Sequence, residues 1–402
     1  MRYKWHPASR VFLPDGSELA RAALGTKDQS LFLPETPLLS TLPRIFHAAE
    51  TGQEFCVCSA GQQINTDAVA AVSDHLQCMT SGSTGAPKTI RRHQQSWIDS
   101  FDLHARFWGI SPNDSTATLG ALSHSLTLYA AMEATYMGAD LHMLTGLRPG
   151  TQFDRLAGVS VLYATPTQLR RLALSPSQAH SKMRLLLVGG GKLGPATATR
   201  IKQMFPNAAL HIFYGASETS FISLSDKTTP EGSVGRAYPD VQIEIRDPDL
   251  NGVGEIWVNS PYLFSGYGQG MSVDTRWDDK WLTVGEMGHI DKAGYLWLSG
   301  RKSRMFTVAD TNVFPEAVED WLMTQPGVQN AAVLPMPDSQ RGQVPVVFMS
   351  GTVDLERLQQ TARATLGPIQ TPRKFWHLSE WPTLPAGKTD YQKLAQLLAH
   401  RT

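Results

Sequence analysis

The sequence predicts an α/β protein: a large N-terminal domain with parallel sheets flanked by helices and a β-rich subdomain, followed by a small α+β C-terminal lid domain. Apolar runs that end at Gly or Pro recur through the first three quarters of the 402 residues, which is typical of buried parallel strands. After residue 230 the apolar runs become short or alternate with polar residues, which indicates a β-rich unit. Beyond residue 302, helical and strand patterns mix in a compact segment.

Three apolar runs in the middle of the chain are expected to be buried strands. They cover residues 159–166, 184–191 and 209–215. Between the last two, residues 194–205 have a proline near their start and are expected to form a helix. Strand, helix and strand in this order indicate a parallel sheet, whose ligands bind beyond the carboxyl ends of the strands.

The β-rich subdomain and the C-terminal domain follow in chain order. The periodicity breaks at residues 300–306, so we place the boundary near Ser303, which gives domains of residues 1–302 and 303–402. Before it, strands are expected at residues 241–245, 254–260 and 294–300. Beyond it, helices are expected at residues 314–327, 353–367 and 390–401, and strands at residues 330–335 and 345–350.

Composition argues against several classes of protein. Lys+Arg and Asp+Glu number 36 each, so the zero net charge does not favour nucleic acid or an anionic membrane as a partner. The sequence contains no run of about 18 apolar residues, so no membrane-spanning helix is expected. The N-terminus lacks the apolar core of a secretory signal, so a cytoplasmic location is expected. Cys56 and Cys58 are expected to alternate in a buried strand rather than to bind metal.

The segment MTSGSTGAPKTIRRH, residues 79–93, surrounds Lys88 with glycines and hydroxyl side chains, as a phosphate-binding loop requires. A Walker A loop would need a glycine before this lysine, but the residue is Pro87, which has no N–H and a fixed φ. A flexible polar linker is the other alternative from this stretch alone. The pattern S/T-S-G-S/T-T-G-x-P-K fits without a mismatch. Its residues are Thr80, Ser81, Gly82, Ser83, Thr84, Gly85, Ala86, Pro87 and Lys88.

This pattern resembles the phosphate loop of the adenylate-forming (AMP-binding) superfamily, which includes acyl-CoA synthetases, peptide-synthetase adenylation domains and luciferases. Further motifs resemble those of the family over nearly the whole chain, and they occur in the family's order. They are LSHSLTLYA (122–130), GGG (189–191), YGASET (214–219), WLTVGEMGHID (281–291), SGRK (299–302), PMPDSQRGQVP (335–345) and LPAGKTD (384–390).

The resemblance implies a role for the residues of the first motifs. His124 would line the acyl pocket, although a lone histidine near apolar residues would by itself suggest a satisfied core histidine. Tyr214 would stack on adenine, Ser217 would meet a phosphate, and Glu218 would hold Mg²⁺, a hard cation that prefers carboxylate and phosphate oxygens. The further nucleotide-binding positions that the resemblance implies are Gly189, Gly190, Gly191, Gly215, Ala216 and Thr219.

The later motifs imply the remaining contacts. Glu286 stands where the family has an aspartate that grips the ribose hydroxyls; it is one methylene longer but also offers two acceptor oxygens. Arg301 would contact phosphate and ribose through its planar fork of donors. Lys388 would be the catalytic lysine on a mobile loop, rather than a solvated lysine before a helix.

The implied reaction activates a carboxylic acid with ATP and Mg²⁺. The carboxylate attacks the α-phosphorus, pyrophosphate leaves, and an acyl-adenylate forms; CoA, or the phosphopantetheine of an acyl carrier protein, then takes the acyl group. Three cations would neutralise the negative charge that these anions bring together. They are the Mg²⁺ ion held by Glu218 and the side chains of Lys88 and Lys388. Two alternatives are a catalytically weak protein that senses nucleotide or acyl ligand, and a P-loop NTPase.

The chain departs from the family in two regions. The family has a longer segment before the phosphate loop, so an N-terminal subdomain is expected to be reduced. In residues 300–319, the hinge aspartate is replaced by Ser303, the next acid by Arg304, a lysine by Thr307 and a glycine by Asp310. These positions act mostly in thioester formation, so the adenylation residues are expected to be kept better than the thiolation residues.

Overall fold

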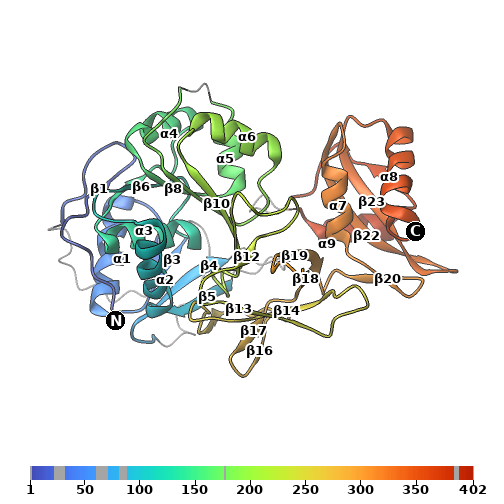
Figure 1. Ribbon diagram of the computed structural model, residues 1–402, viewed down its shortest axis with the longest axis horizontal. Helices are drawn as coiled ribbons and strands as arrows, with labels where there is room; N and C mark the ends of the chain where they lie inside the picture. Colours follow the sequence, from blue (N-terminus) through green and yellow to red (C-terminus); the bar gives the residue numbers. More distant parts are fainter. Residues whose placement is uncertain are drawn as a thin grey trace.

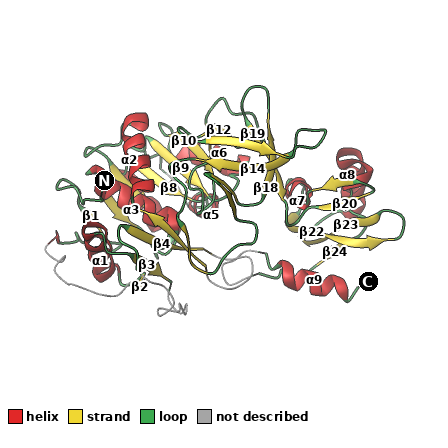
Figure 2. Cartoon of the chain, turned by 90° about the horizontal axis from the view of Figure 1, so that it is seen from below, coloured by secondary structure: helices red, strands yellow, loops and turns green. Residues whose placement is uncertain are grey.

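The computed structural model describes residues 2–21, 32–59, 71–80, 88–175, 178–383 and 389–401. It confirms the predicted α/β class, with parallel-containing sheets, flanking helices and a small C-terminal group of elements (Figure 1). Figure 2 shows that the helices and strands within residues 315–399 gather at one end of the molecule. None of the helices within these residue ranges is long and apolar enough to cross a membrane.

The largest sheet has the strand order β1-β7-β6-β8-β9-β10-β11-β12. Neighbours are parallel from β1 to β10 and antiparallel at β11 and β12. The strands are β1 (Val11–Phe12), β6 (Ser115–Thr118), β7 (Asp140–Met143), β8 (Val161–Ala164), β9 (Leu185–Gly189), β10 (Ala209–Tyr214), β11 (Ser223–Ser225) and β12 (Arg236–Ala237).

Three of these strands and one helix match the expected βαβ pattern. The predicted strands are β8, β9 and β10, and the predicted helix is α6 (Pro195–Met204), which connects β9 to β10. The prediction of full burial holds for β8 and β9 but is wrong for β10, which lies beside the short antiparallel strands and is only partly buried.

A second sheet has the order β15-β5-β4-β3-β2 and carries the phosphate-loop motif between β4 and β5. Its strands are β2 (Phe32–Pro34), β3 (Phe55–Cys58), β4 (His75–Thr80), β5 (Lys88–His93) and β15 (Gly266–Gln269). Cys56 is buried in β3, as expected, whereas Cys58 in the same strand is only partly buried. Across the described ranges, no group of three or more His, Cys, Asp or Glu side chains could hold a metal ion.

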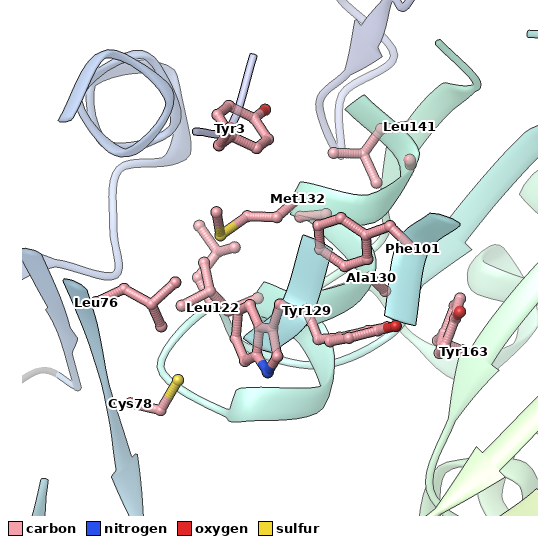
Figure 3. Close-up of a cluster of buried hydrophobic side chains, with 14 of the residues drawn as sticks. Tyr3, Leu76, Cys78, Phe101, Leu122, Tyr129, Ala130, Met132, Leu141 and Tyr163 are labelled. Atoms are coloured by element: carbon pink, nitrogen blue, oxygen red, sulfur yellow. The ribbon is translucent and has the colours of Figure 1, made fainter. Parts of the chain in front are cut away.

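Helices α2 (Gln95–Trp108) and α3 (Ser125–Met137) lie between these two sheets. All residues from 127 to 135 in α3 are buried, because a helix that is apolar on all sides must be enclosed by other elements. Figure 3 shows side chains of both helices, such as Phe101 and Tyr129, between Leu76 of β4 and Tyr163 of β8. The other helical elements here are α1 (Leu38–Thr51), α4 (Pro149–Arg155), η3 (Leu156–Gly158) and α5 (Pro166–Leu172).

The expected β-rich unit is a six-stranded antiparallel arrangement. Strands β16-β17-β14-β18-β19 form one path, and β13 pairs with β14. The three predicted strands correspond to β13, β14 and β19. The bounds are β13 (Gln242–Arg246), β14 (Gly254–Asn259), β16 (Arg276–Asp278), β17 (Trp281–Thr283), β18 (Glu286–Ile290) and β19 (Leu296–Arg301).

The C-terminal elements begin with a two-stranded hairpin and continue with a three-stranded sheet packed by helices. Helix α7 ends four residues before the predicted Gly327, whereas α8 leaves helical geometry at the predicted end, Gly367 (φ 70°, ψ 177°). The bounds are β20 (Phe306–Val308), β21 (Thr311–Val313), α7 (Pro315–Met323), β22 (Val328–Asp338), β23 (Gly342–Gly351), α8 (Leu355–Gln370), β24 (Phe375–His377) and α9 (Tyr391–Ala399).

Candidate active site

The phosphate-loop motif is held by the antiparallel pair β4 and β5. The register places Thr80 opposite Lys88, so the first and last residues of the motif face each other across the two strands. Lys88 is partly buried. The residues between them, Ser81, Gly82, Ser83, Thr84, Gly85, Ala86 and Pro87, lie outside the described part of the chain.

His124 lies beside this hairpin. It directly precedes α3, has an extended backbone (φ −84°, ψ 130°) and forms an isolated parallel bridge with Met79, the residue before Thr80. His124 is exposed, so the alternative interpretation as a satisfied core histidine is wrong. The hydroxyl of the next residue, Ser125, lies 3.3 Å from that of Ser217. The start of α3 therefore connects the phosphate hairpin to the YGASET motif.

The YGASET motif forms a tight turn at the carboxyl end of β10. Tyr214 is the last residue of the strand, and a Cβ atom on Gly215 would lie 1.7 Å from the carbonyl oxygen of Ser220, so only glycine fits. Thr219 is fully buried, and its hydroxyl accepts the N–H of Ala216 at 2.9 Å. These contacts hold the backbone of the turn in one conformation and thereby fix the positions of Ser217 and Glu218.

Glu218 is held at both its backbone and its side chain. Its carbonyl oxygen accepts the N–H of Phe264 at 2.8 Å, and its Oε1 accepts the hydroxyl of Tyr267, also at 2.8 Å. Tyr267 lies on β15 opposite Ile90 of β5, two residues after Lys88. Strand β15 therefore brings the carboxylate expected to bind Mg²⁺ close to the strand that follows the phosphate loop.

Two side chains at this turn were missed by the sequence interpretation. Arg92 is fully buried and donates to the carbonyl oxygens of Ser217 at 2.6 Å and Tyr262 at 2.7 Å, and to the hydroxyl of Ser96 at 3.0 Å. Tyr267 is the other. The available signals were two adjacent arginines in a short strand and a lone tyrosine between glycines, and neither identifies a partner far along the chain.

The GGG motif follows β9, next to β10. A Cβ atom on Gly189 would lie 2.1 Å from the ring of Phe213, while Gly190 (φ 86°) and Gly191 (φ 155°) adopt backbone angles that favour glycine. The hydroxyl of Tyr214 is buried and has no hydrogen-bond partner among the described residues. Burial raises the pKa of Tyr214 well above its usual value, and the negative charge of Glu286 raises it further.

Glu286 and Arg301 form a cross-strand ion pair. They lie opposite each other on β18 and β19, with Nε of Arg301 at 3.1 Å from Oε1 of Glu286. Burial raises the pKa of Glu286; Arg301 opposes this effect and the charge of Glu316 adds to it. Both members of the pair also act on the pKa of Tyr214, which Glu286 raises and Arg301 lowers.

Of the hinge positions, Ser303 and Arg304 contact residues elsewhere in the chain. Ser303 Oγ donates to the Asp274 carboxylate at 3.0 Å. Arg304 bonds Glu319 at 2.7 Å and packs over the ring of Tyr391, whose hydroxyl donates to the same Glu319 at 3.0 Å. Burial alone would lower the pKa of Arg304, but the hydrogen bonds and charge of Glu319 raise it overall.

The other two altered positions lie at the β20–β21 hairpin. Ala309 (φ 45°) and Asp310 (φ 64°) are its two loop residues, and positive φ at both is the geometry of a type I′ turn. Thr307 and Asp310 are exposed. Asp310 therefore has the left-handed backbone that would favour the glycine of the family pattern.

Lys388 lies outside the described residues, together with residues 384–387. The residues on either side, Thr383 and Thr389, form an isolated antiparallel bridge. Asp390 then caps α9 by accepting the N–H of Lys393 at 3.0 Å.

A Mg²⁺ ion would fit the donors at the turn. Glu218 supplies one carboxylate, oriented by Tyr267. Mg²⁺ in nucleotide sites commonly takes one or two carboxylates and completes its shell with phosphate oxygens and water. A single glutamate is therefore a suitable protein contribution for a metal that arrives with ATP.

Comparisons with known proteins define the family. The model described as "AMP-binding enzyme" matches residues 61–268, just over half of the chain, and the model described as "AMP-binding enzyme C-terminal domain" matches residues 317–388. The chain belongs to this family of enzymes, which confirms the resemblance to the adenylate-forming superfamily.

Similar proteins carry the names of CoA ligases. The chain is 32% identical over 320 residues to the "uncharacterized acyl-CoA ligase YhfT" of Bacillus subtilis, covering 77% of this chain and 65% of YhfT. It is 29% identical to the "putative long chain fatty acid-CoA ligase VraA" of Staphylococcus aureus, covering 79% and 70% of the two chains. The chain thus spans less than two thirds of the length of YhfT.

The fold is similar to that of ATP-bound MatB from Rhodopseudomonas palustris, with a TM-score of 0.81. The alignment covers 98% of this chain and 96% of the MatB chain, at 19% sequence identity. At this identity the likeness establishes the architecture: a large N-terminal domain followed by a small C-terminal domain.

Proposed function

We propose that the protein activates a carboxylic acid with ATP, forming an acyl-adenylate and pyrophosphate, and then transfers the acyl group to the thiol of CoA. The observation that carries this proposal is the convergence of three family motifs. The phosphate hairpin, the start of α3 and the Ser217–Glu218 turn are joined by the Met79–His124 bridge and the contact between the hydroxyls of Ser125 and Ser217.

In the first step, a carboxylate oxygen of the acid forms a bond to the α-phosphorus of ATP, and the bond from that phosphorus to the bridging oxygen of pyrophosphate breaks. Lys88 and Lys388 each offer a cation to the phosphates and the carboxylate, whose like charges would otherwise oppose the approach. Ser217 offers a hydroxyl to a phosphate oxygen. The Glu286–Arg301 pair offers acceptors to the ribose hydroxyls and donors to phosphate.

Mg²⁺ bound with the nucleotide would supply further positive charge at the phosphates. Glu218 is the residue that would hold it, and Tyr267 orients the carboxylate for that contact. In the second step, the thiol sulfur bonds to the acyl carbon, the carbon–oxygen bond to AMP breaks, and the thiol proton is released to the solvent. His124 lies at the exposed start of α3, where it would line the acid's site.

The test is a screen of carboxylic acids for pyrophosphate release from ATP. The panel contains short, long-chain, dicarboxylic and aromatic acids, each incubated with the protein and Mg²⁺·ATP, with and without CoA. We expect acid-dependent AMP and pyrophosphate, and an acyl-CoA product when CoA is present. Formation of ADP and phosphate as the only products would contradict the proposal and favour an NTPase.

A carrier protein is the second candidate acceptor. Asp310, exposed at the tip of the β20–β21 hairpin, adds negative charge at a position expected to face the acceptor. Free CoA carries several phosphate charges, whereas pantetheine on a carrier presents fewer beside its thiol. Comparing acyl transfer to free CoA and to a phosphopantetheinyl carrier protein distinguishes the two acceptors.

A further inference from the structure

Arg92 links the two chain segments that hold Glu218. Its Nη2 donates to the carbonyl oxygen of Ser217 at 2.6 Å, and its Nη1 donates to that of Tyr262 at 2.7 Å. The same two segments meet again one and two residues further on, where the N–H of Phe264 donates to the carbonyl oxygen of Glu218 at 2.8 Å. The guanidinium therefore acts as a second crosslink beside a direct backbone hydrogen bond.

The setting of this arginine is unusual for a buried charge. Arg92 is 2% exposed, and within the described part of the chain no carboxylate forms an ion pair with it. Burial lowers the pKa of its guanidinium to about 10, so it remains protonated at neutral pH. Burying a cation is costly, and hydrogen bonds to two carbonyl oxygens and the Ser96 hydroxyl, together with the negative charge of Glu218, offset that cost.

We propose that Arg92 is a positioning residue for the adenylation site: it fixes the Ser217–Glu218 turn against the 262–264 segment so that both side chains are preorganised for ATP. The proposal rests on the proposed function, because the turn has this role only in an adenylating enzyme. The rigid, planar fork of arginine suits the task, since it holds two carbonyl oxygens at fixed relative positions, which a single ammonium cannot do.

The next residue toward the phosphate loop provides a matched control. Arg91 lies on the same strand with its side chain on the opposite face, because side chains alternate along a strand. Its Nε bonds the buried carboxylate of Glu54 at 2.7 Å. Arg91→Gln therefore removes a partly buried cation from the same strand without touching the turn.

The experiment compares the wild type with Arg92→Met, Arg92→Lys and Arg91→Gln. Three quantities are measured: kcat and KM for acid-dependent pyrophosphate release, the affinity for a non-hydrolysable Mg²⁺·ATP analogue by calorimetry, and amide hydrogen exchange of the peptide covering residues 214–221. For Arg92→Met we expect kcat/KM for ATP to fall by about 10- to 100-fold, the range found when partners that orient a metal ligand are removed.

If Arg92 has a positioning role, the effects of Arg92→Met should be confined to the turn and to ATP binding. Amide exchange should accelerate in residues 214–221 but not in β8 and β9, analogue binding should weaken, and KM for the acid should stay unchanged. Arg92→Lys should recover part of the loss, because it restores the charge but not the fork. Arg91→Gln should lower the unfolding temperature and leave the exchange of the turn and kcat/KM unchanged.

Several results would overturn the proposal. A folded Arg92→Met variant with wild-type kcat/KM and wild-type exchange in the turn would do so, as would an equal loss in Arg91→Gln. If Arg92→Met does not fold, wild-type behaviour of Arg92→Lys overturns it. If the wild type itself releases no pyrophosphate with any acid, the proposed function fails, while exchange and analogue binding still decide whether Arg92 fixes the turn.

Discussion

The turn at residues 214–219 and the hinge segment at residues 301–310 both correspond to family motifs, but they are stabilised in opposite ways. The turn keeps its motif and is contacted by β5, by β15 and by the start of α3, all far away in sequence. The hinge segment departs from the pattern that the resemblance to the family predicts, and three of the departing positions, Ser303, Thr307 and Asp310, are exposed.

The charges of the hinge are directed toward both parts of the chain: Arg301 and Lys302 pair with Glu286 and Glu255 of the β-rich unit, whereas Arg304 points toward the C-terminal elements. Arg304 stands in place of a family acid and bonds Glu316 and Glu319 of α7. It also packs over Tyr391, the first residue of α9. The turn is held by contacts within the N-terminal part, whereas the hinge contacts both parts of the chain. Because the proposed adenylation residues and the altered hinge positions have different contacts, we expect the two proposed half-reactions to respond separately to substitutions.

Lys388→Ala should have the largest effect. A lysine that acts only on the carboxylate and α-phosphate is needed for adenylation but not once the adenylate exists. We expect acid-dependent pyrophosphate release to fall by at least about 10²-fold, while thiolysis of supplied acyl-adenylate stays nearly unchanged. The measurement is the rate of each half-reaction in isolation.

The control for this substitution is Lys393→Ala. Lys393 is an exposed lysine on α9, close in sequence to Lys388, and its loss should change neither rate. Equal losses in both half-reactions of Lys388→Ala would indicate a misfolded C-terminal part and would break the proposed separation between the two regions.

Tyr267→Phe tests the side-chain support of the turn. The substitution keeps the ring but removes the hydroxyl that donates to Glu218 at 2.8 Å and contacts Thr275 at 2.9 Å. We expect about a 10-fold rise in the Mg²⁺ concentration needed for half-maximal pyrophosphate release. Tyr295→Phe, which removes a hydroxyl that donates to the carbonyl oxygen of Thr228 between β11 and β12, should leave that concentration unchanged. The same Mg²⁺ requirement in both variants and the wild type would show that Glu218 needs no such support.

The Glu286–Arg301 pair predicts a pH dependence of ATP use. Burial raises the pKa of Glu286, so it becomes protonated at a higher pH than an ordinary glutamate. As the pH falls through that value, the carboxylate loses acceptor strength toward the ribose hydroxyls, and KM for ATP should rise several-fold. KM is measured at pH values between about 5 and 8.

Two variants separate Glu286 from other titrating groups. Glu286→Gln should raise KM for ATP at neutral pH and abolish this step in the profile. Glu286→Asp restores the acid of the family motif and should keep the step. An unchanged profile in Glu286→Gln would show that another group produces the pH dependence.

The fold class and the order of the motifs could be predicted from the sequence, because both depend on local patterns of residues. Apolar runs predicted β8, β9 and β10, and the GGG and YGASET motifs lie at the carboxyl ends of β9 and β10. Arg92 and Tyr267 could not be found in this way. Their significance comes from contacts with Ser217 and Glu218, more than 40 residues away, which local sequence does not encode.

The burial of individual side chains likewise could not be predicted from local sequence patterns. His124 sits in an apolar segment yet is exposed, because it precedes α3, and the buried part of that helix begins only at Thr127. The altered hinge positions could be identified from the sequence, but the Arg304 cluster could not, since it joins α7 and α9 across most of the C-terminal part.

Asp310→Gly should have the smallest effect and concerns the hinge alone. Ala309 and Asp310 both have positive φ in the two-residue loop of the β20–β21 hairpin, a geometry that glycine adopts without strain. The aspartate also adds bulk and negative charge where a polyanionic acceptor is expected to approach. We expect apparent KM for CoA to fall a few-fold and pyrophosphate release to stay unchanged.

Two further variants assign the cause of this effect. Asp310→Asn removes the charge but keeps a side chain, and Ala309→Gly relieves backbone strain at the neighbouring position but keeps the charge. If charge repulsion is responsible, Asp310→Asn should lower KM for CoA nearly as much as Asp310→Gly, and Ala309→Gly should not. If Asp310→Gly instead slows thiolysis, Asp310 contributes to acceptor binding, and the rebuilt hinge is an adaptation to its acceptor rather than a loss of thiolation residues.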